Sequence, residues 1–240
     1  MSFTPSRRNA LITLAIWVAI TIGGGLVQAG GTSSVDKLAS NGIVWGIPVA
    51  ALFLLIAYRG KWSQLGLVEP TSCRPALPAV LAVALLMALA VANGLPATSV
   101  LIFLVVNAMA VGFSEELAFR GVLLRALLGT YSVRRAVLIS AISFGAVHSL
   151  NALMTGELVP ALFQSCLAVG MGMWAANIRI RTGSLYLPMV LHGLWDLALL
   201  IVLNGVAGTT LALAVSVAAL AFAVGLGVWG WRSAGAQAAR

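Results

Sequence analysis

The chain has 240 residues, of which 61% are hydrophobic and 8% are charged, with a mean hydropathy of +1.04. A soluble domain carries roughly a quarter of its residues as charges, so this chain cannot cover a water-facing surface, and we exclude a soluble globular protein. The net charge of +8 does not indicate a nucleic-acid partner, because the basic residues lie between apolar runs rather than in one patch.

Eight apolar runs follow one another along the chain. Most approach the ~20 residues that a helix needs to cross a bilayer, although the run at 42–58 is short. The pattern predicts an all-α, polytopic membrane bundle of about eight transmembrane helices, folded as a single domain over residues 1–240. The runs fall at 10–29, 42–58, 76–94, 98–118, 136–154, 159–178, 185–204 and 209–231.

The positive charges between the runs indicate the orientation. Eight crossings place twelve of the fourteen basic residues on the side of the N-terminus; the exceptions are Lys37, on the other side, and Arg120, expected near the membrane boundary. Basic loops stay in the cytoplasm, so we expect both termini to be cytoplasmic. Residues 6–8 (Ser-Arg-Arg) also resemble a twin-arginine signal with a cleavage site at 27–29. The apolar run is longer than a usual signal core, and we favour a retained helix.

Five ionisable side chains fall within or at the edge of apolar runs: Glu115, Glu116, His148, His192 and Asp196. An ionisable group at membrane depth costs at least ~2.5–3.5 kcal/mol, so such residues normally face a bundle interior or a wet cavity. Counting ~1.5 Å per residue from the basic turns places all of these except Glu116 in one layer, in the inner half or middle of the membrane. The sequence therefore predicts a polar site shared by three helices.

The first pair of acids lies beside an arginine. Glu116 and Arg120 are four residues apart with the acid N-terminal, which is the favourable order for a salt bridge on one helix face. Glu115 is turned by about 100° from that face and is left without this partner. We therefore expect one carboxylate to be held by arginine while its neighbour is free to react.

Both histidines have a partner four residues away on the same helix face. Phe144 precedes His148 at this spacing, and Asp196 follows His192. An acid in this position can orient the imidazole or share a ligand with it. Two histidines with a carboxylate are also a legitimate zinc set, so zinc is the one candidate cofactor, with Glu115, His148, His192 and Asp196 as candidate ligands. The sequence leaves metal dependence open.

The three stretches read Glu115-Glu116-x-x-x-Arg120, Phe144-x-x-x-His148 and His192-x-x-x-Asp196. Together and in this order they resemble the CPBP family of intramembrane proteases, which includes the CAAX prenyl endopeptidases and the bacterial Abi proteins. The resemblance covers residues 114–196 and defines a motif-bearing core at about 98–204. It implies an intramembrane endopeptidase that hydrolyses a peptide bond of a membrane-associated substrate.

The resemblance also implies a role for each matching position. Glu115 would activate the attacking water, and His148 would assist at the water or the leaving group. His192 with Asp196 would stabilise the oxyanion, while Glu116 and Arg120 would be structural partners. Many members of the family have asparagine at the position of Asp196, and an aspartate donates a hydrogen bond only when protonated. We therefore favour Asp196 as a residue that orients His192 or binds a metal.

Two residues near these motifs are assigned to packing. Phe144 is expected to pack rather than take part in the chemistry. Asn151 lies one helical turn after His148 and is interpreted as ordinary polar packing.

Two other functions fit the buried acids and histidines. A proton-coupled transporter uses such groups as relays and would show solute flux without peptide products. A non-catalytic membrane scaffold of the same fold would tolerate the loss of Glu115. We favour the endopeptidase, with membrane lipids and a membrane-associated or lipidated peptide as partners and no nucleic acid. The alanine-rich chain and its short loops indicate a prokaryotic plasma membrane, with the active site reached from the cytoplasmic side.

Overall fold

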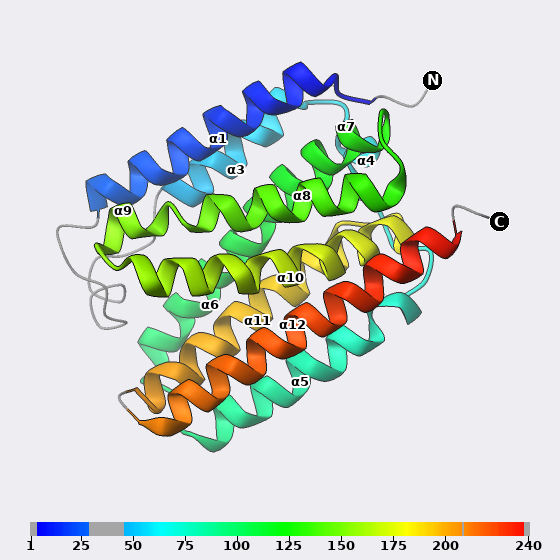
Figure 1. Ribbon diagram of the computed structural model, residues 1–240. Coiled ribbons are helices and arrows are strands. Elements are labelled where there is room, and N and C mark those ends of the chain that lie inside the picture. Colours follow the sequence, from blue (N-terminus) through cyan, green and yellow to red (C-terminus); the bar gives the residue numbers. More distant parts are fainter. Residues whose placement is uncertain (1–3, 29–45, 208, 238–240) are drawn as a thin grey trace.

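The computed structural model describes residues 4–28, 46–207 and 209–237, and this part of the chain contains helices and no strand (Figure 1). The longer helices are α1 (Arg7–Gln28), α3 (Gly46–Ala57), α5 (Leu77–Ala92), α6 (Thr98–Glu116), α8 (Val133–His148), α10 (Leu158–Thr182), α11 (Tyr186–Gly205) and α12 (Thr210–Gln237). The shorter segments are α4 (Trp62–Leu65), the 3₁₀ turn η1 (Arg74–Ala76), the π-helical η2 (Leu117–Leu123), α7 (Leu124–Leu128) and α9 (Asn151–Thr155).

Within the described residues, seven helices are long and apolar enough to cross a membrane. The predicted run at 42–58 corresponds to α3, a shorter apolar helix described over Gly46–Ala57. The prediction of an all-α, polytopic membrane bundle is therefore confirmed. Ala29, at the end of the possible cleavage site, and Lys37 lie outside the described residues.

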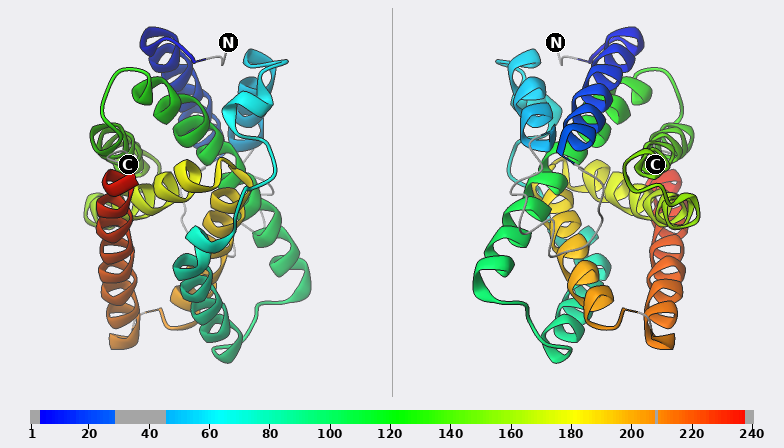
Figure 2. Two further views of the ribbon diagram at one scale, coloured as in Figure 1. Left: turned by 90° about the vertical axis from the view of Figure 1, so that its right-hand side faces the viewer. Right: turned by 90° about the vertical axis from the view of Figure 1, so that its left-hand side faces the viewer.

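The helices from the two ends of the chain lie on different sides of the bundle. In Figure 2, α1 and α3 lie together at the top of both views, while α5, α11 and α12 lie below them. Helix α10 packs against α8 on one side and α12 on the other, and α11 packs against α5 and α6. Helix α1 begins and α12 ends toward the right-hand side of Figure 1, where α7 leads into α8. The cytoplasmic location of this side stays a prediction.

Glycine lets α6 and α11 approach each other at the level of the motifs. A Cβ atom built on Gly112 would lie 2.5 Å from the carbonyl oxygen of Met189 and 2.8 Å from the amide nitrogen of Gly193. Such a contact brings the two backbones together, as small residues do in membrane bundles. The close approach places the end of α6, with its two glutamates, directly beside the histidine helix α11.

The fourth predicted helix extends further than the sequence suggested. The run predicted at 98–118 continues without interruption through η2 and α7 to Leu128. Arg120 is 1% exposed and lies among fully buried neighbours in η2, and its expected position near the membrane boundary stays a prediction. The interior tolerates its guanidinium because an acid from the preceding turn lies next to it.

The fifth predicted run, at 136–154, lies within one candidate membrane span, Val133–Thr155, in which the helix is interrupted. The expected helix at 136–154 ends at His148, and the separate short helix α9 starts at Asn151. The break places His148 at the last position of α8.

Candidate active site

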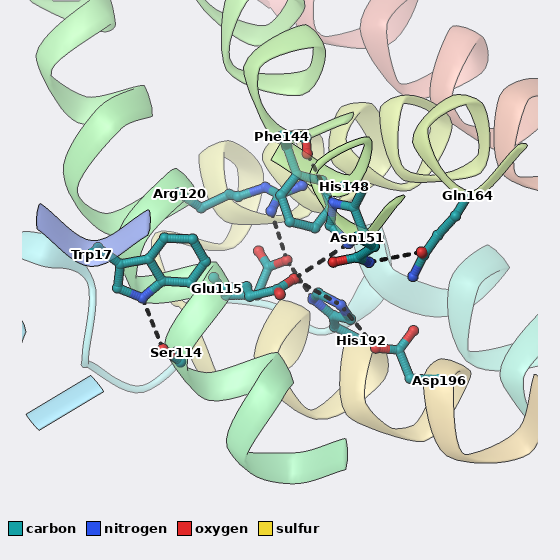
Figure 3. A network of polar contacts seen from close by, with 11 residues as sticks. Trp17, Ser114, Glu115, Arg120, Phe144, His148, Asn151, Gln164, His192 and Asp196 are labelled. Carbon is teal, nitrogen blue, oxygen red and sulfur yellow. Dashed lines mark hydrogen bonds and ion pairs between the residues drawn. The ribbon is translucent and has the colours of Figure 1, made fainter. Parts of the chain in front are cut away.

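The four predicted catalytic side chains come from three elements and converge in the interior of the bundle (Figure 3). Oε2 of Glu115, near the end of α6, lies 3.8 Å from Nε2 of His148 and 3.7 Å from Nε2 of His192. On α11, Nε2 of His192 lies 3.2 Å from Oδ2 of Asp196. The structure therefore brings all four residues to one place, whereas the count along each helix predicted only that they share one layer, and their catalytic roles stay predictions.

The exposed fraction of the side chains increases from His192 to Asp196. The side chain of His192 is 1% exposed, those of Glu115 and His148 are 13% and 14% exposed, and that of Asp196 is 36% exposed. The site is thus closed behind His192 and accessible on the side of Asp196.

Each histidine has its Nδ1 atom fixed by an acceptor. Nδ1 of His148 lies 2.9 Å from the carbonyl oxygen of Phe144, one turn earlier on α8. Because a carbonyl only accepts, Nδ1 of His148 donates this hydrogen bond, and Nε2 is the ring nitrogen that faces Glu115. Nδ1 of His192 lies 2.9 Å from Oε1 of Glu116, so both nitrogens of this ring face carboxylates, with Asp196 at the other end.

Glu116 connects two of the motifs. Its Oε1 atom lies 2.9 Å from Nη1 of Arg120 and 2.9 Å from Nδ1 of His192, and all three side chains are essentially fully buried. The predicted ion pair with Arg120 is present. The contact with His192 was not anticipated from the sequence, because it depends on how α6 and α11 cross.

Arg120 is held mainly by charge and by an aromatic face. Its guanidinium carbon lies 4.2 Å above the centre of the Phe144 ring, the geometry of a cation–π contact. None of its three guanidinium nitrogens makes an aligned hydrogen bond to another described residue, although Nη1 is within ion-pair distance of Glu116. The expectation that Phe144 is a packing residue is therefore incomplete, since its ring separates Arg120 from the histidines.

The ring of Phe144 lies at the centre of an aromatic cluster. It makes edge-to-face contacts with Phe119, His148 and His192, at centroid distances of 4.9, 4.6 and 5.8 Å. This arrangement is the favourable one for aromatic pairs, and it limits the orientations open to both imidazoles. The aromatic residue of the F-x-x-x-H stretch thus positions both histidines.

The first helix reaches the same region through a tryptophan that the sequence did not single out. Trp17 on α1 is 1% exposed, donates a hydrogen bond of 2.9 Å to Oγ of Ser114 and packs edge-to-face on Phe119. Ser114 is the residue before Glu115, so α1 is tied to the backbone that carries the acid. A tryptophan in the middle of an apolar run, away from the membrane interface where it usually lies, was the available signal.

Two carboxamides flank the accessible side of the site. Nδ2 of Asn151 on α9 donates a hydrogen bond of 2.8 Å to Oε1 of Gln164 on α10. Figure 3 shows this pair next to His148, with the carboxamide of Asn151 between Gln164 and the acid–histidine cluster.

The candidate zinc ligands can be compared with the arrangement that a metal ion needs, and zinc as a cofactor stays a prediction. Within the described part of the chain, no three histidine, cysteine, aspartate or glutamate side chains are placed so that they could hold a metal ion. In particular, Glu115 and the two histidines do not form such a set. We therefore derive no chemical step through zinc, and metal dependence is left to experiment.

A polytopic helical bundle with a glutamate and two histidines in its interior is the class of structure expected of an intramembrane hydrolase. Residues 96–198 match the family model described as type II CAAX prenyl endopeptidase Rce1-like, and this segment contains all three motifs. The match confirms the resemblance to CAAX-type intramembrane proteases and covers less than half of the 240-residue chain. This segment of the chain is therefore similar to that family, and the chain is an integral membrane protein. A search of the curated proteins found no match.

Proposed function

We propose that the protein is an intramembrane endopeptidase in which Glu115 activates the water that attacks a peptide bond. The observation that carries this proposal is the position of Oε2 of Glu115, at 3.7 and 3.8 Å from the Nε2 atoms of two histidines. These distances are too long for direct hydrogen bonds, and in the proposed reaction a water molecule bound to Oε2 lies beside the two Nε2 atoms. Oε2 accepts no hydrogen bond from another described residue, so it is available as a base.

In the proposed reaction, Glu115 takes a proton from the water as the water oxygen attacks the carbonyl carbon of the scissile bond. The C=O double bond becomes a C–O⁻ single bond in a tetrahedral intermediate. The intermediate collapses when its C–N bond breaks, and the nitrogen takes the proton back from Glu115, directly or through Nε2 of His148. The products are a carboxylic acid and an amine, and transfer of the acid's proton to the amine leaves a carboxylate and an ammonium group. His192 stabilises the negative charge, and Asp196, 3.2 Å from Nε2, orients its ring.

The substrate class that we propose is a peptide or protein with a lipidated cysteine near its C-terminus. The support is the family model, whose description names CAAX prenyl endopeptidases. The site is accessible next to Asp196, inside a bundle whose outer surface exposes large apolar side chains such as Leu81, Leu85 and Val159. A substrate anchored in the lipid would reach such a site without leaving the membrane.

The test uses two internally quenched fluorescent peptides of the same sequence, one with an S-farnesylated cysteine four residues from its C-terminus and one without. The full chain is purified in detergent and assayed as wild type, Glu115→Gln and Glu157→Gln. Glu157 is an exposed acid in the turn before α10 and serves as the matched control. We expect cleavage by the wild type and by Glu157→Gln, and its loss in Glu115→Gln.

Undiminished cleavage by folded Glu115→Gln would contradict the assignment of the base. No cleavage of either peptide by the wild type would favour the transporter or the scaffold. A parallel assay with a chelator, followed by re-addition of zinc, measures metal dependence. Preference for the farnesylated peptide would support the CAAX substrate class, and equal rates would contradict it.

A further inference from the structure

A polar cavity lies between the first turns of α1 and the end of α3. Helix α1 begins and α3 ends at the same end of the bundle, and the two helices pack against each other (Figure 1). The cavity has a volume of about 310 Å³, and none of its lining residues belongs to the proposed active site. Most of the lining side chains are polar: Ser6, Asn9, Thr13, Tyr58 and Lys61, beside Pro5, Ile12 and Ala57.

The charges around the cavity are all positive. The two segments that form it, residues 4–28 and 46–68, contain Arg7, Arg8, Arg59 and Lys61 and no aspartate or glutamate. No acidic side chain is among the lining residues. An anion in the cavity would therefore be attracted by ammonium and guanidinium groups without facing a carboxylate. A phosphate group fits this chemistry, because it accepts hydrogen bonds from ammonium, amide and hydroxyl donors.

Contacts within and between the helices hold the walls of the cavity in place. The hydroxyl oxygens of Thr13 on α1 and Tyr58 after α3 are 3.2 Å apart and join the two walls. The backbone nitrogen of Asn9 donates to Oγ of Ser6 at 3.2 Å, and that of Lys61 donates to the carbonyl oxygen of Tyr58 at 3.0 Å. The polar side chains thus extend from ordered backbone.

Apolar side chains continue from the cavity along both helices. Ile12 lines the cavity and is exposed, and Ile16, four residues later on the same face of α1, is exposed as well. Helix α3 runs in the opposite direction, so Phe53, four residues before the lining residue Ala57, lies on the same side and is partly exposed. Trp62, at the start of α4, is exposed in the way typical of the membrane interface. These rows suit acyl chains, which a free phosphate ion lacks.

We propose that this cavity binds the phosphate headgroup of an anionic phospholipid, with Lys61 beside the phosphate and an acyl chain along Ile12 and Ile16. The inference is independent of the proposed function. A lipid bound here would hold α1 against α3. Helix α1 also carries Trp17, which donates to Ser114 next to Glu115, so the lipid would stabilise the helix that contacts the active-site segment.

The test measures lipid binding to the full chain by native mass spectrometry after its release from detergent micelles. The probes are dioleoyl phosphatidylglycerol, dioleoyl phosphatidylcholine, which has the same acyl chains and no net charge, and sn-glycerol 3-phosphate, which has no acyl chain. Each basic residue near an anionic lipid contributes about fivefold in affinity. We expect phosphatidylglycerol to bind at least about fivefold more tightly than phosphatidylcholine, and sn-glycerol 3-phosphate to bind more weakly than either.

Three variants assign the phosphatidylglycerol site to the cavity. Lys61→Gln should raise the Kd for this lipid about fivefold, whereas Lys61→Arg keeps the charge and should stay within about twofold of the wild type. Arg135→Gln removes the same charge at an exposed position of α8, outside the cavity, and should also change the Kd by less than about twofold. Because Lys61 is exposed, we expect these variants to fold, and thermal unfolding without lipid checks this.

Several results would overturn the inference. Equal affinity of the wild type for the two phospholipids would exclude a site for an anionic headgroup, whatever the variants show. Binding of sn-glycerol 3-phosphate as tight as that of phosphatidylglycerol would indicate a soluble anion instead of a lipid. An equal loss in Lys61→Gln and Arg135→Gln would show general attraction by surface charge rather than binding in the cavity.

Discussion

Replacing Arg120 by methionine should be among the most destabilising single changes in the bundle. Arg120 and Glu116 are both fully buried and their charged atoms are 2.9 Å apart. Removing one partner of a buried ion pair leaves an uncompensated charge and costs about 3–5 kcal/mol. Methionine keeps most of the apolar stem, so lost packing adds little. The contact with the Phe144 ring is lost as well, at a further cost of up to about 2 kcal/mol for a desolvated cation–π pair.

The charge effect can be isolated by a second substitution in the same pair. Glu116→Gln alone leaves Arg120 without its acid. In the double variant, which combines Arg120→Met with Glu116→Gln, no unpaired charge remains, and the introduced carboxamide still presents an oxygen to Nδ1 of His192. We therefore expect the double variant to be less destabilised than the sum of the two single variants, by more than about 1.5 kcal/mol. Such a coupling energy would show that the pair, and not either side chain alone, stabilises this layer.

The measurement is the free energy of unfolding in mixed micelles, titrated with sodium dodecyl sulfate and followed by tryptophan fluorescence, for which the chain has seven tryptophans. Arg135→Met, at an exposed position of α8, is the matched control and should cost less than about 0.5 kcal/mol. Additive effects of the two single substitutions, or a loss below about 1 kcal/mol for Arg120→Met, would refute the reasoning.

Two further predictions concern the helices around the site. Trp17→Phe removes the hydrogen bond to Ser114 and should lower the free energy of unfolding by about 1–3 kcal/mol and reduce cleavage, whereas Trp229→Phe, at an exposed position, should do neither. Gly112→Ala places a Cβ atom 2.5 Å from a backbone oxygen of α11 and should destabilise the fold by about 1–3 kcal/mol. The Cβ atom of Gly225→Ala meets nothing within 4 Å, so this control should be neutral or slightly stabilising in the same titration. Equal effects within either pair would contradict the corresponding contact.

The common depth of the site residues could be predicted because it depends on regular helix geometry, whereas the fact that they face one another could not. Most of the helices between the basic turns and the motifs are regular, so counting residues gave the depths of Glu115, His148 and His192 relative to one another. The ion pair of Glu116 with Arg120 followed from the spacing of four residues in the same way. It forms even though Arg120 lies in a π-helical segment, where the turn is wider than in an α-helix.

The features that escaped prediction depend on contacts between elements. The π-helix Leu117–Leu123 has the same apolar composition as its neighbours, so hydropathy contains no signal for it. The break before Asn151 occurs inside a continuous apolar run for the same reason. The contacts of Trp17 and Phe144 depend on how α1, η2 and α8 pack against one another, and the residue pattern within a single helix does not specify that packing.

The order of charges through the interior explains why Glu115 is the acid left free to react. Arg120, Glu116, His192 and Asp196 follow one another at 2.9, 2.9 and 3.2 Å, so basic and acidic groups alternate from the closed side of the site to its exposed edge. Each buried charge in this row has a partner of opposite sign, which is the condition for keeping it in the interior. Glu115 stands beside the row, 3.7 Å from His192 and without a hydrogen-bond donor among the described residues. The row fixes His192, and the carboxylate of Glu115 beside it is the one that, in the proposed reaction, meets the water and the peptide carbonyl.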